Sequence, residues 1–180
     1  MAGRTLETAR LVLRPWVKED YAPFAALNCD PRVTATLAGN LTRAESDALA
    51  DRNAAHIQEH GWGLWAVEVK GGTPFIGFTG LSRPRFEAPF TPCVEIGWRL
   101  AFAHWGHGYA TEAAKAVVAF AFEELRLPEI VSFTTVSNIR SRAVMDRLGL
   151  TYDADGDFDH PSLAADHPLR PHVLYRMKAR

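Results

Sequence analysis

The sequence is poor in cysteine, in net charge and in long apolar runs, and each of these absences excludes a class of protein. Two cysteines occur in 180 residues, Cys29 and Cys93, far apart and without a CxxC pair, so we expect two buried free thiols in a reducing compartment. The formal net charge of −1 argues against a nucleic-acid partner. The longest apolar stretch, around Val117 to Phe122, is far too short to span a bilayer, and no apolar signal segment opens the sequence. We therefore expect a cytoplasmic protein without a membrane partner.

The pattern of the chain predicts one domain, residues 1–180, built on a mixed α+β (α/β) plan. No repeat, low-complexity tract or linker divides it, and a chain of this length holds a core without metal or disulfide. Hairpins in the first half precede a β-α-β-α-β order in the second half. The predicted strands are 10–16, 62–69, 75–81, 94–100, 130–136, a strand near 150, and 173–177. The predicted helices are 18–29, 42–60, 108–125 and 138–148, the second opening with Thr42 and Glu45 in capping-box spacing.

The segment from Glu95 to Ala114 is the most informative part of the sequence. A predicted strand runs into a loop with Gly106 and Gly108, and this loop opens directly into a helix. A helix start exposes free backbone amides and the positive end of the dipole, and glycines let the backbone curl around an anion. No Gly-Lys-Ser/Thr follows, so this is not a Walker loop, and Thr111 breaks the dinucleotide fingerprint. The segment predicts a phosphate-binding turn, with a plain strand-to-helix turn as the alternative.

Glu112, in the first turn of this helix, is predicted to have a structural role. On a helical wheel it shares a polar stripe with Thr111 and Lys115, opposite the apolar face that would pack on a sheet. A carboxylate in the first turn complements the helix dipole without any catalytic role.

Two segments resemble the GNAT superfamily of N-acetyltransferases, in particular its ribosomal-protein N-terminal acetyltransferase (RimJ/RimL-like) branch. That branch has E-I-G-x-x-L, a short linker and W-G-x-G-Y-A-T-E-A, and this chain matches it over 95–113. Trp105 stands where the wider superfamily has Gln or Arg, as it does in this branch. The segment 136–150 is similar to an N-x-x-S…LGF block, and the opening TARLVLRPW resembles the branch's first strand. The order of elements agrees over almost the whole chain.

This resemblance implies a mixed, mostly antiparallel sheet of about seven strands, splayed at its centre and flanked by about four helices. It also implies acetyl-CoA as co-substrate and no metal. The pyrophosphate would lie on the loop amides and the pantetheine arm along the preceding strand. The implied cofactor-binding residues are Trp98, Arg99, Leu100, Gly106, His107, Gly108, Tyr109, Ala110, Thr111 and Asn138. A bulge at Gly97 is one way to open the sheet, although a strand glycine also marks close packing, and Asn138 is explained equally well as a helix cap.

Acetyl transfer to an amine needs a route for the amine proton and a proton for the leaving thiolate. Glu95 is the candidate base, because burial in an apolar run would raise its pKa, and a charge on an outer strand face is the alternative. Ser141 is the candidate acid, because its spacing from Val144 and Leu148 places it on the same, inward face of the predicted helix. The alternative is that its hydroxyl bonds back to the backbone of its own helix. Met145 stands where many relatives have a Tyr, so Ser141 or water must supply the proton.

The acceptor is less well specified by the sequence. An acidic segment, Asp153, Asp155, Asp157 and Asp159, would attract a cationic amine, and a solvated loop is the alternative. Acceptors to consider are a protein N-terminal amine, as in the ribosomal-protein branch, or a small amine such as a polyamine, amino acid or aminoglycoside. A non-catalytic acyl-CoA-binding module also stays open, and a homodimer is compatible with every alternative.

Overall fold

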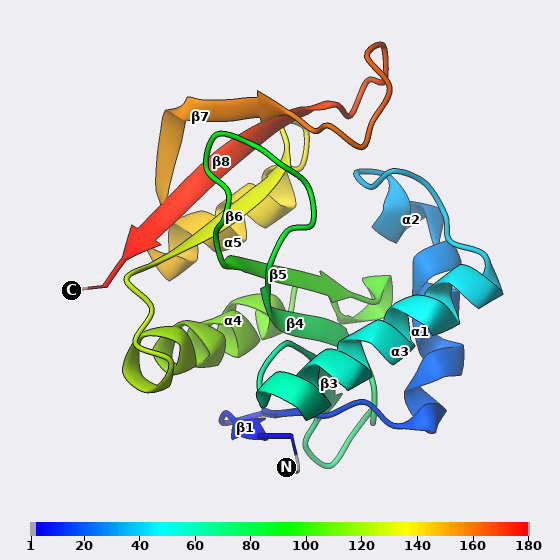
Figure 1. Cartoon of the computed structure of the whole chain (residues 1–180). Coiled ribbons are helices and arrows are strands. Elements are labelled where there is room, and N and C mark those ends of the chain that lie inside the picture. The colour runs from blue at the N-terminus through cyan, green and yellow to red at the C-terminus, as the bar shows by residue number, and fades with distance from the viewer. Residues whose placement is uncertain (1–2, 180) are drawn as a thin grey trace.

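A computed structural model describes residues 3–179, which form one open sheet covered by helices on both faces (Figure 1). The described residues make eight strands in the spatial order β1-β2-β3-β4-β5-β6-β8-β7. The strands are β1 (Leu6–Glu7), β2 (Leu11–Arg14), β3 (Leu64–Val69), β4 (Gly77–Ser82), β5 (Glu95–Leu100), β6 (Glu129–Thr135), β7 (Thr151–Asp159) and β8 (Pro171–Lys178). Every neighbouring pair is antiparallel except β5 and β6, which are parallel. This confirms the mixed, mostly antiparallel sheet, with the two-residue β1 as a strand that the sequence pattern did not predict.

Five α-helices occur in the described part of the chain, one more than predicted. They are α1 (Tyr21–Cys29), α2 (Pro31–Thr34), α3 (Arg43–His60), α4 (Tyr109–Ala119) and α5 (Ile139–Leu148). The short α2 is the addition, and α4 runs on into a π-helical turn over Phe120–Glu124. None of the described helices is long and apolar enough to cross a membrane.

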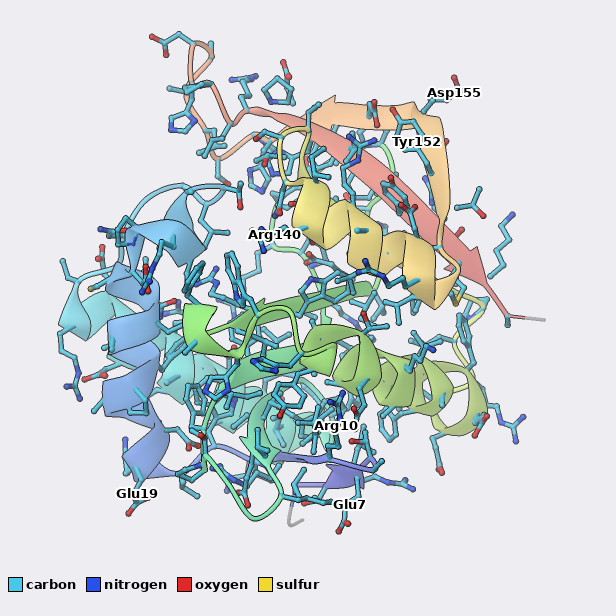
Figure 2. All side chains as sticks on the ribbon, turned by 180° about the vertical axis from the view of Figure 1, so that it is seen from behind. Glu7, Arg10, Glu19, Arg140, Tyr152 and Asp155 are labelled. Carbon is cyan, nitrogen blue, oxygen red and sulfur yellow. The ribbon has the colours of Figure 1, made fainter. Side chains whose placement is uncertain are left out.

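The two faces of the sheet are covered by different helices. Phe78 of β4 packs against Phe24 of α1, with ring centroids 5.9 Å apart, so α1 and its neighbour α3 cover that face. Trp65 of β3 points the other way and contacts Phe120 just beyond α4, with centroids 5.4 Å apart. Seen from behind in Figure 2, α4 and α5 lie in front of the sheet. The core therefore lies in two layers, one on each side of the sheet.

Local signals in the sequence explain where α3 begins and where the chain turns from β3 into β4. Thr42 and Glu45 form the predicted capping box: the Glu45 amide donates to Thr42 Oγ1 at 3.2 Å, and the Thr42 amide donates to Glu45 Oε2 at 2.8 Å. The Gly71-Gly72 turn joins β3 to β4, with the Gly72 amide donating to the Val69 carbonyl at 3.0 Å.

The centre of the sheet opens between the two parallel strands. β5 and β6 pair at Glu95 and Val131, and the Ser132 hydroxyl donates to the Ile96 carbonyl at 2.9 Å before the strands diverge. On its other side β5 keeps an unbroken antiparallel register with β4 from Leu100 to Glu95. The bulge considered at Gly97 is therefore wrong: the strands splay without an extra residue.

Two further expectations are corrected by the structure. Cys29 is exposed, and only Cys93 is partly buried, where burial raises the pKa of its thiol to about 11. The acidic segment is the edge strand β7 and not a loop, with an irregular register between Asp153 and Phe158. Figure 2 shows Asp155 at this outer edge, apart from Arg140 at the start of α5.

Candidate active site

The open side of β5 forms the wall of a cavity of about 820 Å³. Backbone groups of alternate residues point to alternate sides of a strand, and the carbonyls of Ile96 and Leu100 accept bonds on the β6 side. The amide and carbonyl of Trp98, between them, therefore point into the opening. The cavity is lined by Val33, Thr36, Leu37, Trp98, Arg99, Leu100, His104, Trp105, Gly106, Gly108, Tyr109, Ala110, Thr111, Glu112, Lys115, Asn138, Ile139, Arg140, Ser141, Ala143, Val144 and Arg147.

One end of the cavity has the backbone geometry of an anion-binding turn. Gly106 and Gly108 both have φ of +80°, and a Cβ at Gly106 would meet nothing within 4 Å, so the turn is open. The amides of Tyr109, Ala110 and Thr111 make no hydrogen bond among residues 3–179, as is usual in a first helical turn.

Basic side chains complete this end from α4 and α5. Lys115, Arg140 and Arg147 line the cavity, and the Arg140 guanidinium lies 5.1 Å from the Trp105 ring centroid. The combination of free amides, a helix N-terminus and cations suits phosphate groups. The sequence leaves two interpretations of Arg140 open: it could meet the 3′-phosphate of CoA, but an exposed helical arginine needs no such partner.

The side chain of His107 lies outside the cavity, whereas the prediction for this loop concerns its backbone amides. Its side chain is exposed and stacks on Tyr109, with centroids 5.5 Å apart, and it is not among the cavity-lining side chains. Only its carbonyl is engaged, accepting from Arg10 at 3.1 Å.

Asn138 caps α5 and also lines the cavity. Its Oδ1 accepts from the Ser141 amide at 3.2 Å, and its Nδ2 donates to Thr134 Oγ1 at 2.9 Å. The capping interpretation is therefore confirmed. The same bonds hold the N-terminus of α5 against β6 at the cavity wall.

Ser141 faces the cavity as its spacing predicted. Within residues 3–179 its hydroxyl makes no hydrogen bond, so the alternative of a bond back to its own helix is not what the structure shows. Met145, one turn further on, is buried in the core. Ser141 is thus the hydroxyl that α5 presents to the cavity.

Glu95 lies at the start of β5 on the face that carries Phe78 and Arg99. Burial raises the pKa of its carboxyl to about 7, and a hydrogen bond donated by Ser82 Oγ to Oε2, 3.2 Å long, opposes part of that rise. Gly97 follows on the same face, and a Cβ there would meet only Glu95 Oε1, at 3.8 Å. The carboxyl is therefore tuned to gain and lose a proton near neutral pH, but it is not a lining residue of the large cavity.

Glu112 has a structural role, as predicted, and acts as a partly buried clamp between two elements. Its Oε1 accepts from Thr8 Oγ1 at 2.6 Å and from the Arg10 amide at 2.9 Å, and its Oε2 accepts from Arg10 Nε at 2.7 Å. Burial raises the pKa of this carboxyl, but these hydrogen bonds outweigh burial and the pKa is lowered. Arg10, labelled beside α4 in Figure 2, thereby ties the β1–β2 turn to the helix.

The opposite end of the cavity is mostly apolar and comes from a segment that no pattern in the sequence marks. Val33, Thr36 and Leu37 line it, from α2 and the residues just after it. A four-residue helix has no periodicity to detect, and its place beside β5 depends on the fold as a whole. The acidic segment lies elsewhere, with Asp153 bound to Arg176 and Asp159 paired with Arg170 at 3.2 Å.

Comparison with known proteins agrees with this geometry. The acetyltransferase (GNAT) domain family matches residues 10–151. The FsC-acetyl coenzyme A-N(2)-transacetylase of Aspergillus fumigatus is 36% identical over 166 residues, covering 84% of this chain and 66% of that protein, so the chain spans just under two thirds of that relative's length. An acetyltransferase structure from Agrobacterium tumefaciens has a TM-score of 0.77 at 30% identity, covering 98% of this chain and 95% of the other. Mycobacterium smegmatis RimJ in complex with CoA-disulfide shares the fold, with a TM-score of 0.76 at 20% identity over 99% and 90% of the two chains.

The open sheet, the cavity beside it and the family match define an acyltransferase. The chain belongs to the GNAT acetyltransferase family, whose co-substrate is acetyl-CoA. The residues present fit that co-substrate: the cavity is of cofactor size, free amides and cations gather at one end, and unpaired strand backbone follows.

Proposed function

We propose that this chain transfers the acetyl group of acetyl-CoA to a primary amine, which attacks the thioester directly. The observation that carries the proposal is a continuous cavity. It runs from the amides of α4, along the open backbone of Trp98, to the apolar end beside α2. The amides of α4 would bind the phosphates, and the open backbone of β5 would pair with the pantetheine arm. The end beside α2 leaves room for the amine acceptor.

Glu95 and Ser141 are proposed to move the two protons. As the new C–N bond forms, the amine proton passes to the Glu95 carboxylate, directly or through a water. As the C–S bond breaks, Ser141 Oγ donates a proton to the departing thiolate and regains one from solvent. The Trp98 amide is the proposed donor to the carbonyl oxygen, because it points into the opening where that oxygen would lie. A base with a pKa near 7 suits neutral conditions, where most of the amine substrate starts out protonated.

Two acceptor classes follow from different observations. The resemblance of 95–113 and 136–150 to the ribosomal-protein branch supports a protein N-terminal amine. The name of the A. fumigatus relative, an N(2)-transacetylase, supports a small-molecule amine.

A thiol-release assay with acetyl-CoA tests the proposal against a panel of N-terminal peptides and small amines. The expected result is acceptor-dependent release of CoA, with acetylated amine found by mass spectrometry. Tight CoA binding without turnover on any amine would instead indicate a non-catalytic module.

A further inference from the structure

Arg99 is a half-buried cation that lines the cavity near its apolar end. Its Nη1 donates to Asn28 Oδ1 of α1 at 2.7 Å, and its guanidinium carbon lies 5.5 Å from the Phe78 ring centroid. Within residues 3–179 it makes no ion pair and no other side-chain hydrogen bond. Burial lowers the pKa of its guanidinium to about 10, so the charged form is held at a cost. Arg99 is half-buried, and a charge that is largely withdrawn from water normally has a partner of opposite charge, which this one lacks within residues 3–179.

A network behind Arg99 holds it in one orientation. Asn28 is fully buried, and its Nδ2 donates to Ser46 Oγ of α3 at 2.9 Å, where Ser46 is also fully buried. The amide oxygen of Asn28 is thereby aimed at one edge of the guanidinium. The other edge is left accessible from the cavity that Arg99 lines. An arginine fork fixed in this way is prepared for a carboxylate, which it binds with two parallel hydrogen bonds.

This cation is separate from those that suit the phosphates. Lys115, Arg140 and Arg147 come from α4 and α5, on one side of the sheet, whereas Arg99 is held by α1 on the other. Arg99 shares its face of β5 with Glu95, and Gly97 between them contributes no side chain. A small molecule above Gly97 would have a proton acceptor at one end and a cation at the other.

We infer that Arg99 binds the carboxylate of an acceptor that carries its amine and an acidic group in one small molecule, as a free amino acid does. The inference rests on the proposed acetyl transfer and names its substrate class. A polyamine or aminoglycoside lacks the carboxylate and adds like charge beside Arg99.

Matched acceptors test this inference: leucine, leucinamide and isopentylamine, each with saturating acetyl-CoA. We expect the ratio of kcat/KM for leucine to that for leucinamide to fall roughly 10- to 100-fold in Arg99→Met, the range expected for a charge-assisted pair. Using the ratio cancels the different basicities of the two amines. Asn28→Asp is a second variant: it keeps the side-chain shape, and its carboxylate would occupy Arg99 from within, so the same fall is expected. Arg52→Met, an exposed position on α3, should leave the ratio unchanged.

Several outcomes would overturn the inference. An equal ratio in wild type, Arg99→Met and Asn28→Asp would do so while leaving the proposed acetyl transfer intact. Use of Asp-Leu-amide in preference to Asn-Leu-amide, without use of leucine, would show that the carboxylate comes from a peptide side chain. If no amine is turned over, the acetyl-transfer proposal fails separately, and calorimetry of leucine binding to the CoA-bound protein decides this point. Binding that is lost in Arg99→Met supports the inference, and no binding to wild type overturns it.

Discussion

Glu95 and Glu112 show how position sets the acidity of two carboxyls in one protein. Glu95 receives a hydrogen bond from Ser82, and burial prevails, so its pKa rises to about 7. Burial also raises the pKa of Glu112. The hydrogen bonds that Thr8 and Arg10 donate stabilise its carboxylate by more than burial destabilises it, so its pKa falls. The first carboxyl is poised for proton transfer, and the second stays ionised as a fixed anion.

Replacing Glu95 by Gln is expected to lower kcat by about 10² to 10⁴, because the proton acceptor is lost while the shape is kept. The wild-type rate should rise through the pH range near 7, and the defect should shrink at higher pH as more amine becomes neutral. A pH–rate profile of both proteins is the measurement. Full activity of Glu95→Gln across the neutral range would make the residue structural.

The same variant has a stability signature of known sign. A folded-state pKa raised to about 7 gives stability that is present below the unfolded value and lost as pH rises through 7. Glu95→Gln should therefore gain Tm relative to wild type at pH 8.5 but not at pH 4.5. Equal differences at both pH values would show that the carboxyl is not desolvated.

Ser141→Ala is expected to slow turnover modestly, since water can replace its proton, and to leave acetyl-CoA affinity unchanged. The defect should shrink with an acyl donor whose thiol has a lower pKa, because that leaving group needs less help. Single-turnover rates with two donors make the comparison. A defect independent of the leaving thiol would remove Ser141 from the acid role.

At the scale of elements, the start of α4 is the place proposed to bind the phosphates of the cofactor. Gly108→Val places a side chain at φ +80°, where the loop must curl close to the phosphates, so CoA affinity should fall by more than tenfold. Gly71→Val is the matched control, since Gly71 has φ +68° and open space around it but lies in the β3–β4 turn. Both variants should lose similar Tm, and calorimetry should show a CoA defect in Gly108→Val alone. Equal CoA affinities would exclude the loop from the site.

The clamp between α4 and the β1–β2 turn is the second element-scale feature. Glu112→Gln leaves its hydrogen-bond donors poorly matched and should cost about 1–3 kcal/mol at neutral pH. Because the folded-state pKa is lowered, this stabilisation is present above the unfolded pKa and is lost as pH falls through the folded value. Denaturant unfolding of wild type and variant should converge in stability at acid pH. A gap that persists at pH 3 would assign the effect to packing.

On the scale of the molecule, a cofactor in the splay would join two parts that the sheet barely connects. β5 and β6 are paired at one position, Glu95 with Val131. The cavity between them is lined by residues of α4, which follows β5, and of α5, which follows β6. CoA at a hundred times its Kd should add about 2.7 kcal/mol, which is a rise in Tm of roughly 5–10 °C for a domain of this size. Thermal unfolding with and without CoA measures it, and Gly108→Val should show no rise. No rise in wild type at a saturating concentration would argue against binding across the splay.

Local patterns in the sequence were sufficient for most elements of this fold. The capping box of Thr42 and Glu45, the Gly71-Gly72 turn and the strand-loop-helix around Gly108 each depend on contacts between near neighbours, so the chain itself encodes them. The inward direction of Ser141 follows from helical spacing in the same way. Together with the motif resemblance, these features determine the order of elements, the glycine turn at the start of α4 and the family.

Tertiary structure decided the features that depend on residues distant in sequence. The splay forms because β5 pairs with β4 along its whole length but with β6 at one position. No sequence pattern within β5 predicts this difference in pairing. Whether the acidic segment is a loop or an edge strand is decided by its pairing with β8. Arg99 has a neutral partner because α1 brings Asn28 to it from 71 positions away in the sequence. Burial, and with it the acidity of Glu95, is a property of everything packed around a group, which is why only the folded chain could assign it.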